Sequence, residues 1–407
     1  MNNRKISTLL VSLLVALPLL GAFPNQVSAT SSRVAVVKEV KGTAKVQKAG
    51  GSKEFTAFAK MTINEGDILA TGAGSSVILK FRNGQSDDDL MTVAPGSTLS
   101  FDKLSDSKGT RTKISLRKGS VWVEVKSITS TDDKYELETP TAAMGVRGTS
   151  FFAAYDPSIN AAQLLTTDGA VGVDVWPRPG SDPVDGYLYP AQWGVYAGGD
   201  GENIGKMSTV NLDIFSGAAD PVILRSILRQ AQQIISKNIS FVTTMDSRKE
   251  QSSAEFPGLP EQSELRDQYV YNVKHLLDLI ARAAIDSGKL SEKQIIEIEN
   301  EISAETGNVF SFDKTVSIQL TDTELKEQGE MLKLLVDLQK NKQTDSTTSG
   351  YGNKELVRKL LEQRNLQKQM NESAREQRFK KVEDEYIKQL ADNDKTRFLQ
   401  DKRNLNQ

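Results

Sequence analysis

Hydrophobic and polar residues alternate through most of the first half of the chain. Between Val34 and Tyr196 the pattern has a period of two, as in Val121, Val123 and Val125 around Trp122 and Glu124. Such alternation is typical of β strands with one buried face. Turn signals separate the strands at short intervals, among them Asn83-Gly84 and Asp168-Gly169, which favour tight hairpins. The pattern predicts an all-β domain over residues 30–205, built as a solenoid-like or sandwich-like stack of short strands.

From about residue 206 the apolar period changes to that of an α-helix. Asp220-Pro221 is an N-cap followed by proline at the first helical position, and apolar residues then recur at three- and four-residue steps. A second helix is expected between Leu265 and Ala284, and capping boxes at Ser291/Gln294 and Thr321/Glu324 predict two more. Residues 206–342 are therefore expected to form a helical bundle, with a linker at 246–263.

The last part of the chain is polar and charged. Residues 343–353 contain glycine, serine and threonine and are expected to be a flexible joint. Residues 354–407 lack proline and glycine, and their apolar positions are too irregular for a long coiled coil. We expect a charged helical or disordered tail, and helices in the C-terminal half could support an oligomer.

The N-terminus has the features of a secretory signal peptide. Arg4 and Lys5 precede an uncharged run from Ile6 to Phe23, and Val27-Ser28-Ala29 is a small-residue cleavage site. Cleavage after residue 29 would leave no integral membrane segment, so the protein is expected outside the cytoplasm, secreted or at the cell surface. A retained, uncleaved anchor is the alternative.

Composition removes several kinds of chemistry. The 407 residues include no cysteine and one histidine, His275. Thiolate nucleophiles and zinc–thiolate centres require cysteine, and Ser-His-Asp triads require histidine, so the sequence offers almost none of the residues for these sites. We predict no catalytic residues, cofactor or metal. With 51 basic and 53 acidic residues, the chain has no net positive charge that would attract nucleic acid.

One arginine lies between two glycines in the small and apolar stretch Thr139–Phe152. Arg147 is flanked by Gly145 and Gly148, which allow positive φ or the close approach of another backbone. A half-buried guanidinium needs a carboxylate or carbonyl oxygens facing it. We interpret Arg147 as an internal brace in a structural turn, with ligand binding as the alternative.

The order of short motifs resembles the FecR domain. Gly42–Val46 is followed by Gly66–Gly72, Ser76–Phe81, Leu116–Trp122, the Thr139–Phe151 stretch and Thr167–Val171, over about residues 34–175, with Gln192–Val195 resembling the closing strand. The residues that carry the family motif are Thr139, Pro140, Gly145, Val146, Arg147, Gly148, Thr149, Phe151, Asp168 and Gly169.

This resemblance implies an elongated, twisted β architecture with its core at 34–175, built to bind or pair with partners. The best-known members relay the state of an outer-membrane receptor through a cytoplasmic anti-sigma segment. Because the predicted signal peptide comes first, we expect that segment to be missing, as in secreted and cell-surface members. The expected function is non-enzymatic binding of an envelope protein or polysaccharide in signalling or assembly. Alternatives are a structural envelope protein and a carboxylate-dependent glycan hydrolase using Glu124, Glu136 and Glu138.

Other candidate sites have simpler interpretations. Asp87-Asp88-Asp89 could gather calcium, but a solvent-facing turn is favoured. The Asp286–Glu297 stretch has the length of a calcium loop without its middle ligands, so it is interpreted as a helix–turn–helix connection. His275 is expected at the boundary of a helix face. A group of aromatic residues could form a sugar platform, although packing is favoured: Trp176, Tyr187, Tyr189, Trp193 and Tyr196.

Overall fold

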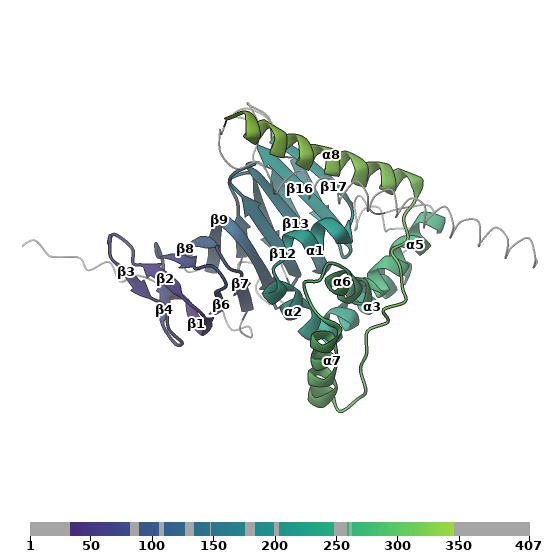
Figure 1. Cartoon of the computed structure of the whole chain (residues 1–407), viewed down its shortest axis with the longest axis horizontal. Coiled ribbons are helices and arrows are strands. Elements are labelled where there is room, and N and C mark those ends of the chain that lie inside the picture. The colour runs from purple at the N-terminus through teal and green to yellow at the C-terminus, as the bar shows by residue number, and fades with distance from the viewer. Residues whose placement is uncertain are drawn as a thin grey trace, which may run out of the picture. The chain divides into compact units, whose positions relative to one another are not determined.

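The computed structural model describes most of the chain between Arg33 and Asp345. The described ranges are 33–81, 89–105, 110–126, 134–146, 148–175, 184–198, 203–247, 259 and 263–345. Strands occupy the chain up to Thr209 and helices follow from Leu212 (Figure 1). This is the β-then-α fold class that the change of period predicts.

The strands form two layers that share β9. One layer, sheet A, has the order β4 (Thr62–Asn64), β1 (Arg33–Lys41), β6 (Ser76–Phe81), β7 (Asp89–Val93), β9 (Thr110–Glu124), β12 (Ser150–Asp156), β13 (Ala161–Asp168), β16 (Gln192–Gly198) and β17 (Asn203–Thr209). The other, sheet B, has the order β3 (Glu54–Thr56), β2 (Ala44–Gln47), β5 (Ile68–Thr71), β8 (Thr98–Ser105), β9, β10 (Lys134–Glu138), β11 (Ala142–Val146), β14 (Val171–Val175) and β15 (Val184–Leu188). Neither layer closes on itself among the described strands, so the sheet is open.

A bend in β9 connects the layers. Its first part pairs with β8 and β10 in sheet B, and its last part pairs with β7 and β12 in sheet A. Gly119 stands between the two parts with φ of +90°, and an added Cβ would lie 2.5 Å from the Cα of Ser97. Only glycine fits this close approach, so Gly119 permits one strand to serve both sheets.

The period-two pattern assigns alternate residues to two hydrophobic cores. Val121 and Val123 point into the core between the sheets, together with Phe151 of β12. Trp122 and Phe152, the intervening residues, belong to a second core on the other face of sheet A. Sheet A is therefore buried on both faces, which explains why apolar residues occupy both parities in its central strands.

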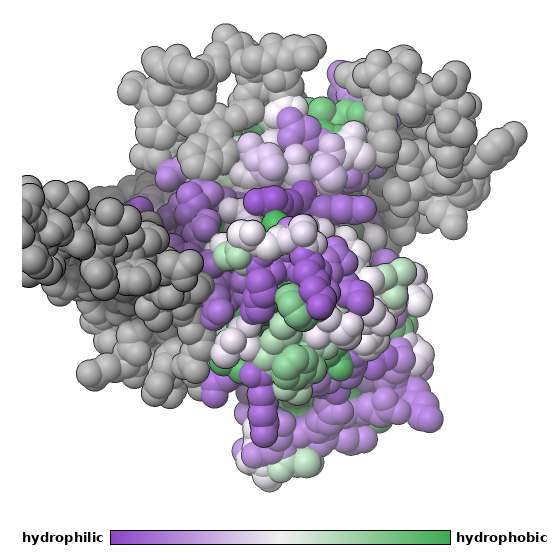
Figure 2. All heavy atoms as spheres, turned by 90° about the vertical axis from the view of Figure 1, so that its left-hand side faces the viewer, coloured by the Kyte–Doolittle hydropathy of each residue, from purple (hydrophilic) through white to green (hydrophobic). Residues whose placement is uncertain are grey.

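The helices cover the second face of sheet A. They are α1 (Leu212–Ala218), α2 (Pro221–Arg229), α3 (Ala231–Ser247), α5 (Ser263–Lys274), α6 (Leu276–Asp286), α7 (Glu292–Thr306) and α8 (Asp322–Asp345). Helix α2 contacts β7 and β9, α3 contacts β13, and α8 contacts β17 (Figure 1). The outer surface of α7 is mostly hydrophilic (Figure 2), because Ile295, Ile298 and Ile302 are buried.

The predicted caps are present. The carboxylate of Asp220 accepts a hydrogen bond from the Val222 amide at 2.9 Å, and Ser291 and Gln294 form a reciprocal capping box before α7. Thr321 and Glu324 bond to each other in the same way at the start of α8. These short-range bonds satisfy amides that have no partner inside the helix.

One predicted helix is divided. The continuous helix expected between Leu265 and Ala284 is wrong, because α5 ends at Lys274 and α6 begins at Leu276. His275 stands at the break, and its Nδ1 lies 3.0 Å from Oδ2 of Asp278. The His275 side chain is 34% exposed, in agreement with the expected place at the boundary of a helix face. Among the described residues, no helix combines the length and hydrophobicity required to cross a membrane.

Candidate functional site

The motif stretch begins with a turn held by Thr139. Its hydroxyl accepts from the Ala142 amide at 3.1 Å, and its own amide donates to the Ala142 carbonyl at 2.8 Å. Pro140 is exposed at the corner, between β10 and β11. The Thr-Pro pair therefore closes a tight connection between two neighbouring strands of sheet B.

The next motif residues occupy β11 and the connection to β12. Gly145 is exposed on the outer face of sheet B, whereas Val146 is buried between the sheets. Gly148 has φ of +70°, in agreement with the expected positive φ at this glycine. Arg147 lies outside the described residues, so its predicted role as an internal brace stays a prediction. Phe151 is fully buried in the core between the sheets.

Thr149 and Gly169 fit closely against each other. The Thr149 hydroxyl donates to the Ala170 carbonyl at 2.9 Å, and the Thr149 carbonyl accepts from the Val125 amide at 3.0 Å. Gly169 has φ of +69°, and a Cβ added there would lie 2.8 Å from Oγ1 of Thr149. The hairpin glycine is therefore required both by its backbone conformation and by the space that Thr149 takes.

Asp168 is the buried charge at the centre of this arrangement. Its side chain has no exposed surface, and its Oδ1 accepts from the Ser150 amide at 3.1 Å and from Nζ of Lys237 at 3.0 Å. Burial raises the pKa of the Asp168 carboxyl, and the Lys237 charge opposes that rise. Lys237 also reaches the Gly148 carbonyl, at 3.4 Å. One lysine of α3 thus bonds to two residues of the motif, Gly148 and Asp168.

A second carboxyl group lies next to this pair. Glu124 of β9 is opposite Ser150 in the sheet, and its Oε1 accepts from the indole Nε1 of Trp122 at 3.1 Å. Burial raises the pKa of Glu124 to about 7, and the negative charge of Asp168 adds to the rise. With a pKa of about 7, Glu124 is half protonated near neutral pH, whereas Asp168 has the ammonium group of Lys237 beside it.

Residues 67–172 match the FecR protein family. The chain carries a FecR domain. The matched range is narrower than the predicted 34–175, and it contains every motif residue named above. Strands β1 to β4, before the matched range, extend both sheets of the FecR domain.

Two solved structures are similar to part of the chain. Both are crystal structures described as a "putative anti-sigma factor" from Parabacteroides distasonis, one with 15% identity and a TM-score of 0.28, the other with 16% and 0.26. The matches cover 37% and 34% of this chain, and 63% and 58% of those proteins. The chain thus spans less than two thirds of the length of these structures. No curated protein matches it.

The three acids suggested for a hydrolase do not form one site. Glu124 lies in the sheet A part of β9, whereas Glu136 and Glu138 lie on β10 of sheet B. Lys113 forms an ion pair with Glu138 at 2.5 Å. Burial raises the pKa of Glu136, and the hydrogen bond with Glu138 adds to the rise. The three acids are therefore divided between the two sheets, with Glu136 and Glu138 adjacent on β10.

Two of the weaker sequence hypotheses receive an answer. The solvent-facing turn expected for Asp87-Asp88-Asp89 is wrong for Asp89, which is fully buried in β7 and accepts from the Lys126 amide at 2.8 Å. Asp87 and Asp88 lie outside the described residues. The helix–turn–helix reading of Asp286–Glu297 is confirmed, since α6 ends at Asp286 and α7 begins at Glu292.

The aromatic group is mostly used in packing, as favoured. Tyr189, Trp193 and Tyr196 are buried, while Tyr187 is 50% exposed. Trp176 lies outside the described residues. Phe152, Trp193 and Phe215 form a cluster of ring contacts between sheet A and α1. These rings attach the helices to the FecR domain, leaving Tyr187 as the accessible member of the described group.

Lys237, the partner of the buried Asp168, is a residue of the motif site that sequence reasoning missed. Its place in a helical pattern marks it only as a polar position on α3. Asp168 was predicted only as the first residue of the hairpin dipeptide Asp168-Gly169. That pattern indicates a turn and does not predict a positively charged partner. The contact joins residues 69 positions apart, so local pattern could not reveal it.

Proposed function

We propose that the protein is exported and that its FecR domain binds a protein or envelope polymer in signalling or assembly, without catalysing a reaction. The observation that carries this proposal is the FecR domain at residues 67–172. Among its described motif residues, Thr139 bonds to Ala142, Thr149 to Ala170 and Asp168 to Lys237. These internal bonds suit a scaffold, which supports our proposal that recognition uses another surface.

The outer face of sheet B offers such a surface. Strand pairing aligns Lys113, Glu136, Gly145, Gly172 and Tyr187 in one row across β9, β10, β11, β14 and β15. A Cβ added at Gly145 would meet nothing within 4 Å. The row is therefore a strip with a charged side at Lys113 and Glu136, bare backbone at Gly145, and the exposed Tyr187, whose Cε1 would lie 3.7 Å from a Cβ added at Gly172.

This strip has the properties of a recognition surface for an extended partner. Backbone without side chains permits close approach, and a half-exposed tyrosine supplies rigid contact area at low entropic cost. Exposed aromatic residues beside flat surfaces are enriched in interfaces. The partner class we favour is a protein or polysaccharide of the cell envelope that lies across β11 and β14.

Photo-crosslinking in growing cells tests the proposal. A benzophenone amino acid at Tyr187 should give a discrete adduct of the exported protein, and the same probe at Ile239 of α3, which is 53% exposed, should not. Mass spectrometry and glycosidase digestion then distinguish protein from polysaccharide adducts. An adduct that is equally strong at both positions, or missing at both, would contradict the assignment of this surface.

Two further measurements address export and role. The mature N-terminus should be Thr30, as measured by mass spectrometry of the extracytoplasmic fraction; intact protein in the cytoplasm would contradict export. Deletion should alter transcription while cell shape is preserved. Altered shape with unchanged transcription would instead support a structural envelope protein.

A further inference from the structure

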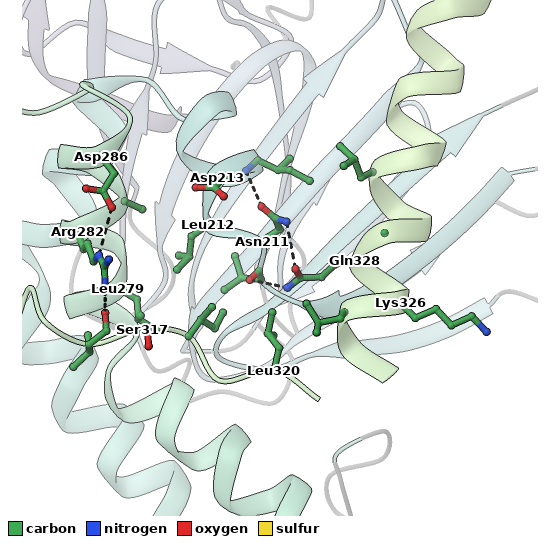
Figure 3. A pocket seen from close by; sticks show the side chains of 18 of the residues that line it. Asn211, Leu212, Asp213, Leu279, Arg282, Asp286, Ser317, Leu320, Lys326 and Gln328 are labelled. Carbon is green, nitrogen blue, oxygen red and sulfur yellow. Dashed lines mark hydrogen bonds and ion pairs between the residues drawn. The ribbon is translucent and has the colours of Figure 1, made fainter. Parts of the chain in front are cut away.

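A cavity of about 420 Å³ opens between the end of sheet A and three helices (Figure 3). Its walls come from the β17–α1 junction, from α6, from the extended segment before α8, and from α8 itself. Pockets that bind small molecules usually measure roughly 300–1,000 Å³ and are mainly apolar. Many of the lining side chains are aliphatic, among them Leu212, Ile214, Leu279, Ile318, Leu320 and Leu332.

Two polar side chains, Asn211 and Gln328, connect the walls of the cavity. Asn211 accepts from the Ile214 amide at 3.0 Å and donates to Gln328 at 3.3 Å. Gln328 donates in turn to the carbonyls of Thr209 and Val210, at 2.9 and 3.1 Å. These bonds tie α8 to the start of α1, so the cavity is preformed.

The opposite wall is held by Arg282. Its guanidinium donates to the Val316 carbonyl at 2.8 Å and lies 3.4 Å from Oδ2 of Asp286. The cation of this wall is therefore already shared between a carbonyl and a carboxylate.

Asp213 differs from its neighbours. Within the described chain its carboxylate has neither a hydrogen bond nor an ion pair, although it lines the cavity between the two bonded walls (Figure 3). Burial raises the pKa of Asp213, and the negative charge of Asp286 raises it further. The other charged groups at the same cavity are Asp322 and Lys326 of α8. Asp213 thus lacks the counter-charge that a half-buried carboxylate normally has.

Two other features add space beside Asp213. Gly329 contributes to the wall from the interior of α8, where glycine costs about 1 kcal/mol relative to alanine and leaves no side chain to fill the hollow. A second cavity, of about 520 Å³, shares Asp213, Ile214 and Leu332 with the first. The carboxylate of Asp213 therefore stands where two hollows meet, the second of which is also lined by Lys118, Asp156, Asp220 and Lys289.

We propose that this cavity binds an aliphatic cation, with its primary ammonium group on Asp213 and its hydrocarbon chain among the leucine and isoleucine side chains. The ammonium supplies three donors and the positive charge that the described walls do not give to Asp213. A free alkylamine and a lysine side chain of a polypeptide share this chemistry.

Calorimetric titration of the purified full-length chain at pH 7.5 tests the assignment. Hexylammonium should bind in a one-to-one ratio, at least about tenfold more tightly than hexanol, since a charge-assisted hydrogen bond contributes about 1.5–3 kcal/mol and 1.4 kcal/mol is tenfold. Hexanoate should bind more weakly than hexanol. Equal binding of hexylammonium and hexanol would overturn the assignment.

Variants locate the site. Asp213→Asn should remove the preference for hexylammonium over hexanol, whereas Asp337→Asn, at an exposed position of α8, should preserve it. Gly329→Leu should weaken both ligands by filling the cavity, with folding checked by circular dichroism. Unchanged hexylammonium affinity in Asp213→Asn would contradict the proposal even if the glycine variant does not fold.

Peptide and free amine are then compared directly. A short peptide with lysine between two leucines competing more strongly than hexylammonium would identify a polypeptide as the source, and weaker competition would identify a free amine. The cavity is on the helical side of sheet A, so binding there and partner binding at sheet B can fail separately.

Discussion

Nζ of Lys237 lies 3.0 Å from Oδ1 of Asp168, and the same amine lies 3.4 Å from the carbonyl oxygen of Gly148. The carboxylate has no exposed surface, and the lysine side chain is 30% exposed. A helix that follows the FecR domain in sequence therefore neutralises a buried charge in the domain's own motif. This contact couples the stability of the motif to the attachment of α3.

Replacing Lys237 with methionine should destabilise the protein. The variant keeps most of the aliphatic stem but leaves Asp168 without its cation, at an expected cost of about 1–3 kcal/mol in the free energy of unfolding. Urea unfolding at pH 7.5 measures the loss. Lys340→Met, at a 69% exposed position with a surface ion pair, should change the same quantity by less than about 0.5 kcal/mol. Equal effects of the two substitutions would show that the buried contact contributes nothing.

The stability of the protein should fall as pH rises through the titration of Glu124. Its pKa is raised from 4.5 to about 7, so between these values the folded state binds more protons than the unfolded state. Stabilisation is therefore fully present only below about pH 4.5 and is lost as pH approaches and passes 7. The raised pKa of Asp168 acts with the same sign.

Glu124→Gln tests this dependence. The glutamine cannot ionise, so the decline in the free energy of unfolding between pH 5 and 8 should be smaller by about 1–3 kcal/mol, using 1.36 kcal/mol for each pKa unit and allowing for partial exposure. Denaturant unfolding at four pH values gives the slope. Parallel slopes for the variant and the natural protein would contradict the shifted pKa.

Gly169→Ala should be more damaging than Gly50→Ala. Both glycines have φ of +69°, so both substitutions carry the same backbone penalty of about 1 kcal/mol. At Gly50 the added methyl group meets nothing within 4 Å, whereas at Gly169 it lies 2.8 Å from Oγ1 of Thr149. We expect Gly169→Ala to cost at least about 1 kcal/mol more. Identical melting temperatures for the two variants would show that Thr149 yields without cost.

Gly145→Arg should block the proposed partner while leaving the fold intact. The backbone of Gly145 needs no positive φ and its added side chain points into open space, so the melting temperature should change little. The crosslink from position 187 should be lost. Ile239→Arg places the same charge on α3 and should preserve the crosslink. Retention of the crosslink in Gly145→Arg would remove the glycine strip from the interface.

The sequence by itself determined the fold class, the helix caps and the FecR assignment. Period-two and period-3.6 patterns follow from backbone geometry, so they indicate strands before Tyr196 and helices after Asp220 wherever the chain folds. Capping at Asp220, Ser291 and Thr321 depends on residues within one turn. These features need only neighbours in sequence, and the described structure contains them.

Only the tertiary structure decided which polar groups meet. The bend at Gly119 that divides β9 between two sheets, the burial of Asp89, and the pairing of Lys237 with Asp168 each depend on residues far apart in the chain. The same holds for the unpaired carboxylate of Asp213, whose surroundings come from α1, α6 and α8. The electrostatic energy of a charged group depends on the burial, charges and hydrogen bonds around it in space. Packing of the layers therefore decides which charges are buried and which are paired.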